Sequence, residues 1–131
     1  NGDNIVVERL VAKNINFAAA SIESWKGGIY NDVVFRDIAI DYVGSSDESL
    51  KNIVIARPPA DSRPLPCWGW YARNVCNLTF ENVELTYNGE EVRPAFWFDN
   101  VGNVVMKNVN YQPSRNPQSM ILENAGIVKV E

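Results

Sequence analysis

The segment 77–87, NLTFENVELTY, constrains the fold most strongly, because four other segments of the chain align with it in one register. These segments begin at Asn4, Asp32, Asn103 and Ile127. The five starting positions, 4, 32, 77, 103 and 127, are separated by 28, 45, 26 and 24 residues. Such self-similarity is typical of solenoid proteins, in which each repeat buries the apolar face of its neighbour. The interval of 45 predicts an insertion within one repeat.

Apolar and polar residues alternate within each repeat, which predicts β-strands. Leu78 and Phe80 alternate with polar neighbours, and the alternation resumes at Val83 after a break. No segment keeps apolar residues at helical spacing for three turns. We therefore predict an all-β fold for residues 1–131, a right-handed parallel β-helix of about four coils that forms part of a longer helix.

A polar residue breaks the alternation at the same place in three repeats, at Asp37, Asn82 and Asn108. Asn and Asp tolerate turn geometry, and an Asn amide can donate and accept hydrogen bonds. We therefore expect corners at these residues, with inward-facing amides bonded from coil to coil.

The insertion is expected at residues 44–66, which are rich in Ser, Asp, Gly and Pro. This composition is typical of a long surface loop. Loops of this length inside a compact domain are often functional.

A further strand per repeat is predicted at 69–75, 95–101 and 120–125, with a weaker match at 19–24. The inward side chains of these strands are Trp70, Ala72, Phe96, Phe98, Met120 and Leu122. The outward side chains form two columns, with Tyr71, Trp97 and Ile121 in the first and Glu23, Arg73, Asp99 and Glu123 in the second. Parallel strands lie about 4.8 Å apart, so each column brings side chains of successive repeats into contact.

The charged column has two interpretations. Glu23 and Asp99 are two coils apart, roughly 9.6 Å, which is near the upper end of the carboxylate separation in inverting glycosidases. Alternatively, Arg73 lies between them in a surface ion-pair ladder. We favour the ladder, in which exposed pairs contribute under about 1 kcal/mol each.

The aromatic residues Trp68, Tyr71 and Trp97 also have two interpretations. They could form a sugar-stacking platform beside a cleft made by the insertion, since an aromatic ring offers a flat apolar face with a polar edge. They could equally pack beneath the insertion. With Arg73 and Asp99, these three residues are the candidate substrate-binding set.

Composition excludes several classes of function. The chain has 12 basic and 16 acidic residues, a net charge of −4 and no basic run, so it lacks the positive surface of nucleic-acid-binding proteins. Its apolar runs are too short to span a bilayer, so no membrane partner is expected. The absence of histidine removes His-dependent nucleophiles, so any catalysis would depend on carboxylates. We expect no metal or cofactor, and free thiols at Cys67 and Cys76 are favoured over a disulfide.

The run PCWGWYARNVCNLTFENVELTYNGEEVRPAFWFDNV, residues 66–101, resembles the later coils of bacterial polygalacturonase-like proteins. These form the glycoside hydrolase family 28 group of the pectin-lyase-like superfamily, where "YGLYARHVxxLTLxNV" is followed by "xRPALxxDxV". The resemblance implies an extracellular or periplasmic enzyme that cleaves acidic plant polysaccharide by inversion, using paired aspartates.

The catalytic segments of that family are absent from this chain. The family uses an "NTD" segment, an Asp-Asp pair, a "GHG" segment and an "RxK" segment, and none of them occurs here. The resemblance therefore implies the C-terminal coils of a polysaccharide-degrading enzyme, which supply scaffold and part of the substrate cleft without catalytic residues. The alternative is a carbohydrate-binding or structural β-helix module, such as a tailspike-like one.

The two ends of such a stack are expected to be apolar and uncovered. Ile5, Val7 and Leu10 would lie at one end, and Val128 and Val130 at the other. Unpaired strand edges recruit other strands, and natural solenoids cover them with caps. We therefore predict association through the ends, either between copies or with upstream coils.

Overall fold

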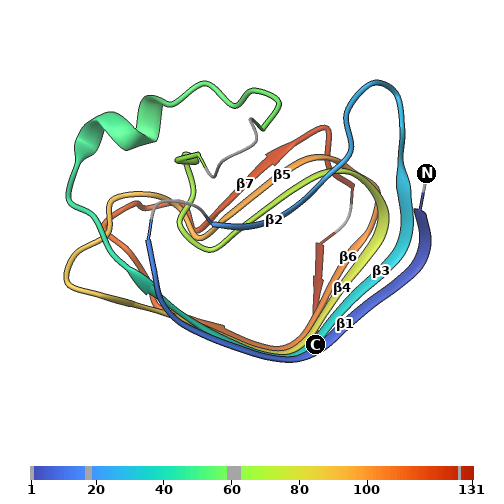
Figure 1. Cartoon of the computed structure of the whole chain (residues 1–131), viewed down its shortest axis with the longest axis horizontal. Coiled ribbons are helices and arrows are strands. Elements are labelled where there is room, and N and C mark those ends of the chain that lie inside the picture. Colours follow the sequence, from blue (N-terminus) through green and yellow to red (C-terminus); the bar gives the residue numbers. More distant parts are fainter. Residues whose placement is uncertain (1, 17–18, 59–62, 127) are drawn as a thin grey trace.

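The computed structural model describes residues 2–16, 19–58, 63–126 and 128–131, and these form an all-β structure with parallel strand pairing (Figure 1). Eight strands belong to one sheet. The helical content of the described ranges is one short 3₁₀ helix, η1 (Glu48–Asn52). The strands are β1 (Gly2–Ile15), β2 (Ala20–Glu23), β3 (Tyr30–Val43), β4 (Trp70–Asn88), β5 (Phe96–Val101), β6 (Val104–Tyr111), β7 (Met120–Glu123) and β8 (Val128–Val130).

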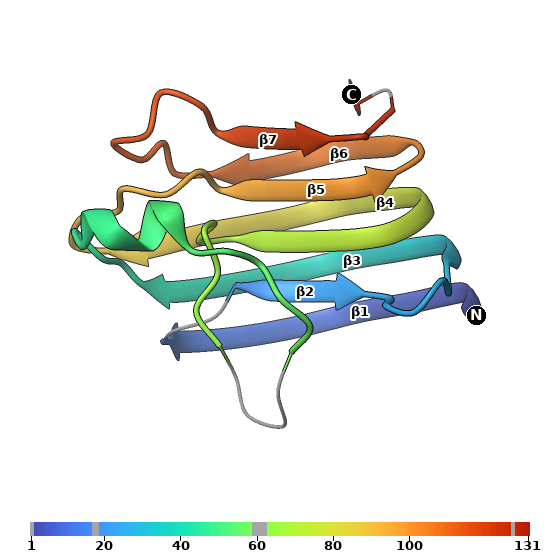
Figure 2. The ribbon, with the colours of Figure 1, turned by 90° about the horizontal axis from the view of Figure 1, so that it is seen from above.

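The long strand β4 joins two rows of strands, because its two parts pair with different neighbours. Its first part pairs with β2 and β5, and β5 pairs with β7. Its second part pairs with β3 and β6, which extend the row to β1 and β8. Successive repeats follow one path around a common interior (Figure 1) and lie one above another (Figure 2). This arrangement is consistent with a β-solenoid.

The strand register confirms the predicted alignment of the repeats. One column of paired residues runs through the five strands of the longer row: Ile5, Val33, Leu78, Val104 and Val128. The predicted starting residue Ile127 lies outside the described residues. The weaker match at 19–24 is also confirmed, since Ala20 pairs with Trp70.

The corner residues occupy the predicted positions along the chain, but they face solvent. Asp37, Asn82 and Asn108 have φ angles of 56°, 53° and 52°, a left-handed conformation that Asn and Asp adopt more readily than most residues. The ladder between them lies on the surface, where Asn108 Nδ2 donates to Asn82 Oδ1 (2.9 Å) and Asn82 Nδ2 donates to Asp37 Oδ1 (3.1 Å). The inward placement is wrong because the corner adds one residue to the alternation. Glu81 and Asn82 therefore both stand outside between two buried residues.

Two further Asn columns bond from repeat to repeat. Asn100 Nδ2 donates to Asn74 Oδ1 (2.7 Å), and both residues have positive φ angles. Asn103 Nδ2 donates to Asn77 Oδ1 (3.0 Å). These columns hold the corners of successive repeats in register.

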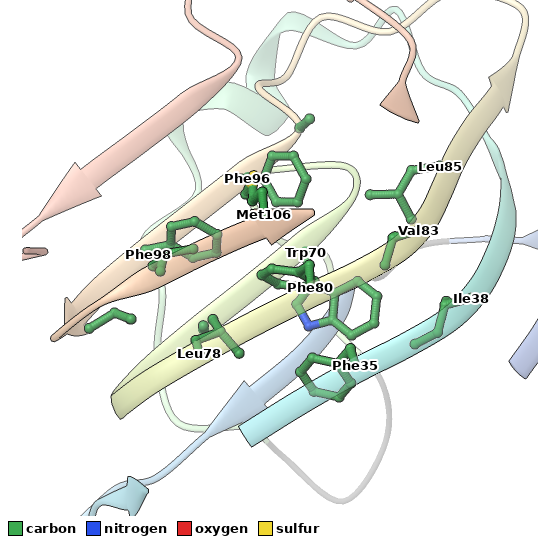
Figure 3. Close-up of a cluster of buried hydrophobic side chains, with 14 of the residues drawn as sticks. Phe35, Ile38, Trp70, Leu78, Phe80, Val83, Leu85, Phe96, Phe98 and Met106 are labelled. Carbon is green, nitrogen blue, oxygen red and sulfur yellow. The ribbon is translucent and has the colours of Figure 1, made fainter. Parts of the chain in front are cut away.

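Aromatic rings fill the interior between the two rows of strands (Figure 3). The ring centroid of Phe80 on β4 lies 5.2 Å from that of Trp70, 5.7 Å from that of Phe35 and 5.9 Å from that of Phe96. These rings are buried, and burial of such a side chain stabilises the fold by about 1.5–3 kcal/mol. The interior is therefore built from the inward set that the alternation predicts.

The insertion, of which the structure describes residues 44–58 and 63–66, belongs to the connection from β3 to β4 and lies over the outer side of the row β2–β4–β5–β7 (Figure 1). A buried ion pair holds it in place. Arg93 Nη2 donates to Glu91 Oε1 (2.7 Å), and Arg93 Nη1 donates to the carbonyl of Leu65 in the insertion (3.2 Å). Cys67 is buried beneath it and Cys76 is half-buried on β4. Both thiols are free, as predicted.

The ends of the stack expose apolar residues, as the repeats predict. Val7 and Leu10 on β1 are 36% and 39% exposed and Val130 on β8 is 75% exposed, whereas Ile5 and Val128 are half-buried. Leu122, which the alternation directs inward, is 47% exposed. The prediction that Leu122 is buried is therefore wrong, because β7 is the last strand of its row in the described ranges and nothing there covers Leu122.

Candidate functional site

The outer side of the row β2–β4–β5–β7 gathers the charged candidates. Glu23 pairs in register with Arg73, Arg73 with Asp99, and Asp99 with Glu123, so the predicted column is confirmed. We call this surface the charged face, and it comprises Glu23, Trp25, Arg63, Arg73, Trp97, Asp99 and Glu123.

Arg73 is held between a carboxylate and an indole ring. Its Nη1 atom pairs with Asp99 Oδ2 on the adjacent strand. Its guanidinium carbon lies 3.9 Å from the centroid of the Trp25 ring, in a cation–π contact. The side chains of Arg73 and Asp99 remain 28% and 22% exposed, so both can contact a ligand.

Glu23 pairs with the insertion rather than with Arg73. Arg63 Nη2 forms the ion pair with Glu23 Oε1, and Trp25 Nε1 donates to the same oxygen (3.2 Å). The predicted ladder, with Arg73 bridging Glu23 and Asp99, is therefore wrong in its first half. The physical reason is competition, because the insertion places a second guanidinium against Glu23.

Two indole rings belong to the charged face and both are half-buried. Trp97 Nε1 donates to Glu123 Oε1 (2.6 Å) on the adjacent strand. Trp25, which sequence reasoning missed, follows β2 and supports Arg73. The pattern contained a signal, since Trp25 continues the alternation of Ser21 and Glu23.

Tyr71, predicted to stand outside with Trp97, is fully buried. Its side chain packs beneath the insertion against Ala19, Leu65 and Cys67. Burial raises the pKa of Tyr71 to about 12, against the opposing effect of the nearby Arg73 guanidinium. The predicted orientation is correct but the predicted exposure is wrong, because the insertion covers this part of the outer side.

Trp68 is also buried, within the interior rather than beside the charged face. It is 1% exposed, and its ring packs edge-on against those of Tyr42 (5.5 Å) and Tyr87 (5.0 Å). Neither Trp68 nor Tyr71 offers a ring face to solvent. Of the three rings predicted as a platform, Trp97 alone is accessible.

The charged face offers hydrogen-bond acceptors, guanidinium donors and indole surfaces on neighbouring strands. Each carboxylate of the column accepts from a specific donor: Glu23 from Arg63, Asp99 from Arg73 and Glu123 from Trp97. This favours a surface that binds polar ligands over one that delivers protons to them.

Other features of the described residues do not converge on this face. A hollow of about 330 Å³ lies along the corner ladder, lined in part by Asp37, Asn82 and Asn108, whose side chains already bond one another. The described ranges contain no group of three or more Cys, Asp or Glu residues placed to hold a metal ion. They also contain no helix that is long and apolar enough to cross a membrane.

Comparison with known proteins finds no match to this chain among protein-family models, curated proteins or solved structures. The functional argument therefore depends on the residues and geometry described above.

Proposed function

We propose that this chain is the C-terminal part of a right-handed parallel β-helix in a polygalacturonase-like glycoside hydrolase, and that its charged face forms part of the substrate cleft. Its role there is scaffold and polysaccharide contact, with catalytic residues supplied from outside this chain. The stacked parallel register and the sequence resemblance over residues 66–101 support this proposal. The resemblance also carries the expected extracellular or periplasmic location.

The observation that carries the proposal is the pair of partly exposed indoles flanking Arg73 and Asp99. Trp97 stands one strand away from Arg73, and Trp25 contacts the Arg73 guanidinium from the other side. Aromatic faces suit the apolar faces of sugar rings, while carboxylates and guanidiniums bind hydroxyl groups. The same face therefore provides both kinds of contact that an oligosaccharide needs.

The charge of the face restricts the kind of polysaccharide. Three carboxylates, Glu23, Asp99 and Glu123, outnumber two guanidiniums, Arg63 and Arg73, and the whole chain has a net charge of −4. A polyanion would therefore meet a net repulsion. We infer that neutral or methyl-esterified stretches of a pectin-like polysaccharide bind better than polygalacturonate.

Calorimetric titration with matched oligosaccharides tests this proposal. We expect methyl-esterified oligogalacturonate to bind more tightly than the de-esterified form at low ionic strength, and high salt to reduce the difference. Trp97→Ala should weaken binding at least tenfold, whereas the control Val105→Ala, on the outer side of β6, should leave it unchanged. Absence of binding to either sugar, or equal effects of the two substitutions, would reject the charged face as the site.

The alternative is a non-catalytic carbohydrate-binding or structural module of the tailspike-like kind. The engagement of every carboxylate of the column with a specific donor favours it, since no free acid is left to act on a bond. The enzyme and the binding module predict different activities for the polypeptide that contains this chain. Hydrolysis of pectin-like polysaccharide by the polypeptide that contains this chain, lost on Trp97→Ala, would support the enzyme, and binding without hydrolysis would support the module.

A further inference from the structure

The free edge of β1 is an exposed and unusually long strand edge. β1 spans 14 residues and, among the described residues, pairs only with β3 (Figure 2). Val6, Val7, Leu10 and Val11 along it are 53%, 36%, 39% and 69% exposed. An edge of this kind presents backbone groups on which a further strand can pair. Its length and apolar character distinguish it from β8, which spans three residues.

A column of alternating charge reaches this edge. Glu8 pairs in register with Arg36, Arg36 with Glu81, and Glu81 with Lys107. Arg36 bridges its two neighbours, with Nη1 3.4 Å from Glu8 Oε2 and Nε 3.2 Å from Glu81 Oε2. Glu81 therefore stands between two basic residues, whereas Glu8 has its strand partner on one side only. Arg9, from the same strand, approaches Glu8 at 3.4 Å but is 79% exposed.

The interior is hollow at the same end. An apolar hollow of about 200 Å³ is lined by Ala12, Ala20, Ile40 and Tyr42 among others. Small residues line this first repeat, whereas Trp68 and Trp70 fill the next one. A neighbouring repeat with a large apolar side chain would fill the hollow.

We propose that the β1 edge docks a further β-repeat. Its parallel strand has apolar residues over Ile5, Val7 and Leu10, and a lysine or arginine over Glu8. The basic residue completes the alternation of the column, and a large apolar side chain enters the hollow beside Ala12. This partner is not a second copy of the chain.

The opposite end of the column disfavours the second copy. Glu131 follows Val130, which pairs with Met106, so Glu131 extends the column beyond Lys107. Head-to-tail stacking of two copies would therefore place Glu131 of one against Glu8 of the other. Like charges directly opposite each other destabilise a strand pair. The repeat that the edge accepts must carry the opposite charge.

A peptide with the sequence of residues 30–43 provides the probe, because in register it places its Arg36 over Glu8 of the full chain. We expect the fluorescently labelled peptide, carrying a neutral solubilising tail, to bind the chain in an anisotropy titration. A peptide with Arg36→Glu should bind at least about fivefold more weakly.

Charge reversal in the full chain provides the matched control. Glu8→Arg should reverse the preference between the two peptides, while Glu131→Arg, at the other end, should leave it unchanged. Thermal denaturation of both variants verifies that they fold. Absence of peptide binding, equal binding of both peptides, or a reversal caused by Glu131→Arg would each overturn the proposal.

The self-association of the chain gives an independent readout. In sedimentation at micromolar concentrations, Glu131→Arg should increase head-to-tail association at least about fivefold over the unchanged chain, because it places opposite charges at the junction. Association of the unchanged chain that equals that of the variant would show that a second copy is the natural occupant, and the proposal would be wrong.

Discussion

The outer sides of the two strand rows follow the same alternation but differ in what covers them. On the row β1–β3–β4–β6–β8, the outward residues Arg36 and Glu81 are 38% and 34% exposed, as alternation predicts. On the row β2–β4–β5–β7, the outward residue Tyr71 is fully buried beneath the insertion. Alternation thus determines on which side of a strand a side chain lies. The burial of that side depends on a segment that is remote in the sequence.

The charged columns on the two sides show the same difference. On the outer side of the row β1–β3–β4–β6–β8, which we call the open side, Arg36 bridges Glu8 and Glu81 across three strands. On the covered side, Arg73 pairs with Asp99 only, because Arg63 of the insertion pairs with Glu23. The same order of acid, arginine and acid therefore gives two different networks. A covering segment changes the electrostatics of a face as well as its exposure.

The largest expected effect is on stability, and it distinguishes the buried ion pair of Arg93 and Glu91 from the exposed ladder around Arg36. Arg93→Ala leaves the buried Glu91 carboxylate without its partner, which should reduce the free energy of unfolding by about 3–5 kcal/mol. Arg36→Ala, on the open side, should reduce it by less than about 1 kcal/mol. Urea unfolding of both variants measures the two losses, and equal losses would contradict the distinction between the covered and open sides.

The second prediction concerns pH and the thiol beneath the insertion. Burial raises the pKa of Cys67 from 9.0 to about 12. Between pH 9 and 12 the unfolded state therefore loses this proton before the folded state, and stability falls as pH rises through that window. The loss from this group should reach about 2 kcal/mol at pH 10.5.

Comparison of the unchanged chain with Cys67→Ala isolates this group. Both should unfold more easily above pH 9, because burial also raises the pKa of Tyr71 and Tyr42. The slope of stability against pH should be shallower in Cys67→Ala. Identical slopes in chemical denaturation from pH 8 to 10.5 would mean that water reaches Cys67 and that the insertion does not seal it.

The third prediction concerns the corner ladder on the open side. Asn82→Ala should reduce the free energy of unfolding by about 1–2 kcal/mol, because alanine is strained at a φ of 53°. Asn82→Gly, which adopts positive φ without strain, should reduce it by less than half of that amount. If glycine is as harmful as alanine in thermal denaturation, the bond to Asp37 rather than the backbone conformation is the important contribution.

The smallest expected effect is on catalysis. The isolated chain should release no reducing ends from polygalacturonate, because it lacks the catalytic segments of the family it resembles. Asp99→Asn should change nothing in this assay, since Asp99 is engaged by Arg73. Release of reducing ends that Asp99→Asn abolishes would mean that the charged face is itself catalytic.

The repeat and its register could be predicted from the sequence because they depend on local alternation. Each strand has to bury one side, so the pairing of Leu78 with Val33 and Val104 follows from aligning the apolar positions. The positions of the corners follow from Asn and Asp, which tolerate the left-handed conformation. Their outward direction was missed because a corner adds one residue to the strict period of two.

The candidate site could be predicted in part. The column of Glu23, Arg73, Asp99 and Glu123 follows directly from the register. Trp25 was missed because it lies beyond the end of its strand, where alternation was not extended. Trp68 was misplaced because it lies in the connection before β4, where no period applies.

Alternation and spacing in the sequence are sufficient to predict the strands, their neighbours and the side of the row on which each residue lies. These are properties of the chain within one repeat and its aligned neighbours. Which rings are accessible, and which residue pairs with Glu23, depend on where the insertion places Arg63 and Leu65 on the outer side. No local pattern encodes that path, because it is stabilised by a buried contact between Arg93 and a carbonyl 28 residues away. Tertiary packing alone decided which part of the outer side remains open to a ligand.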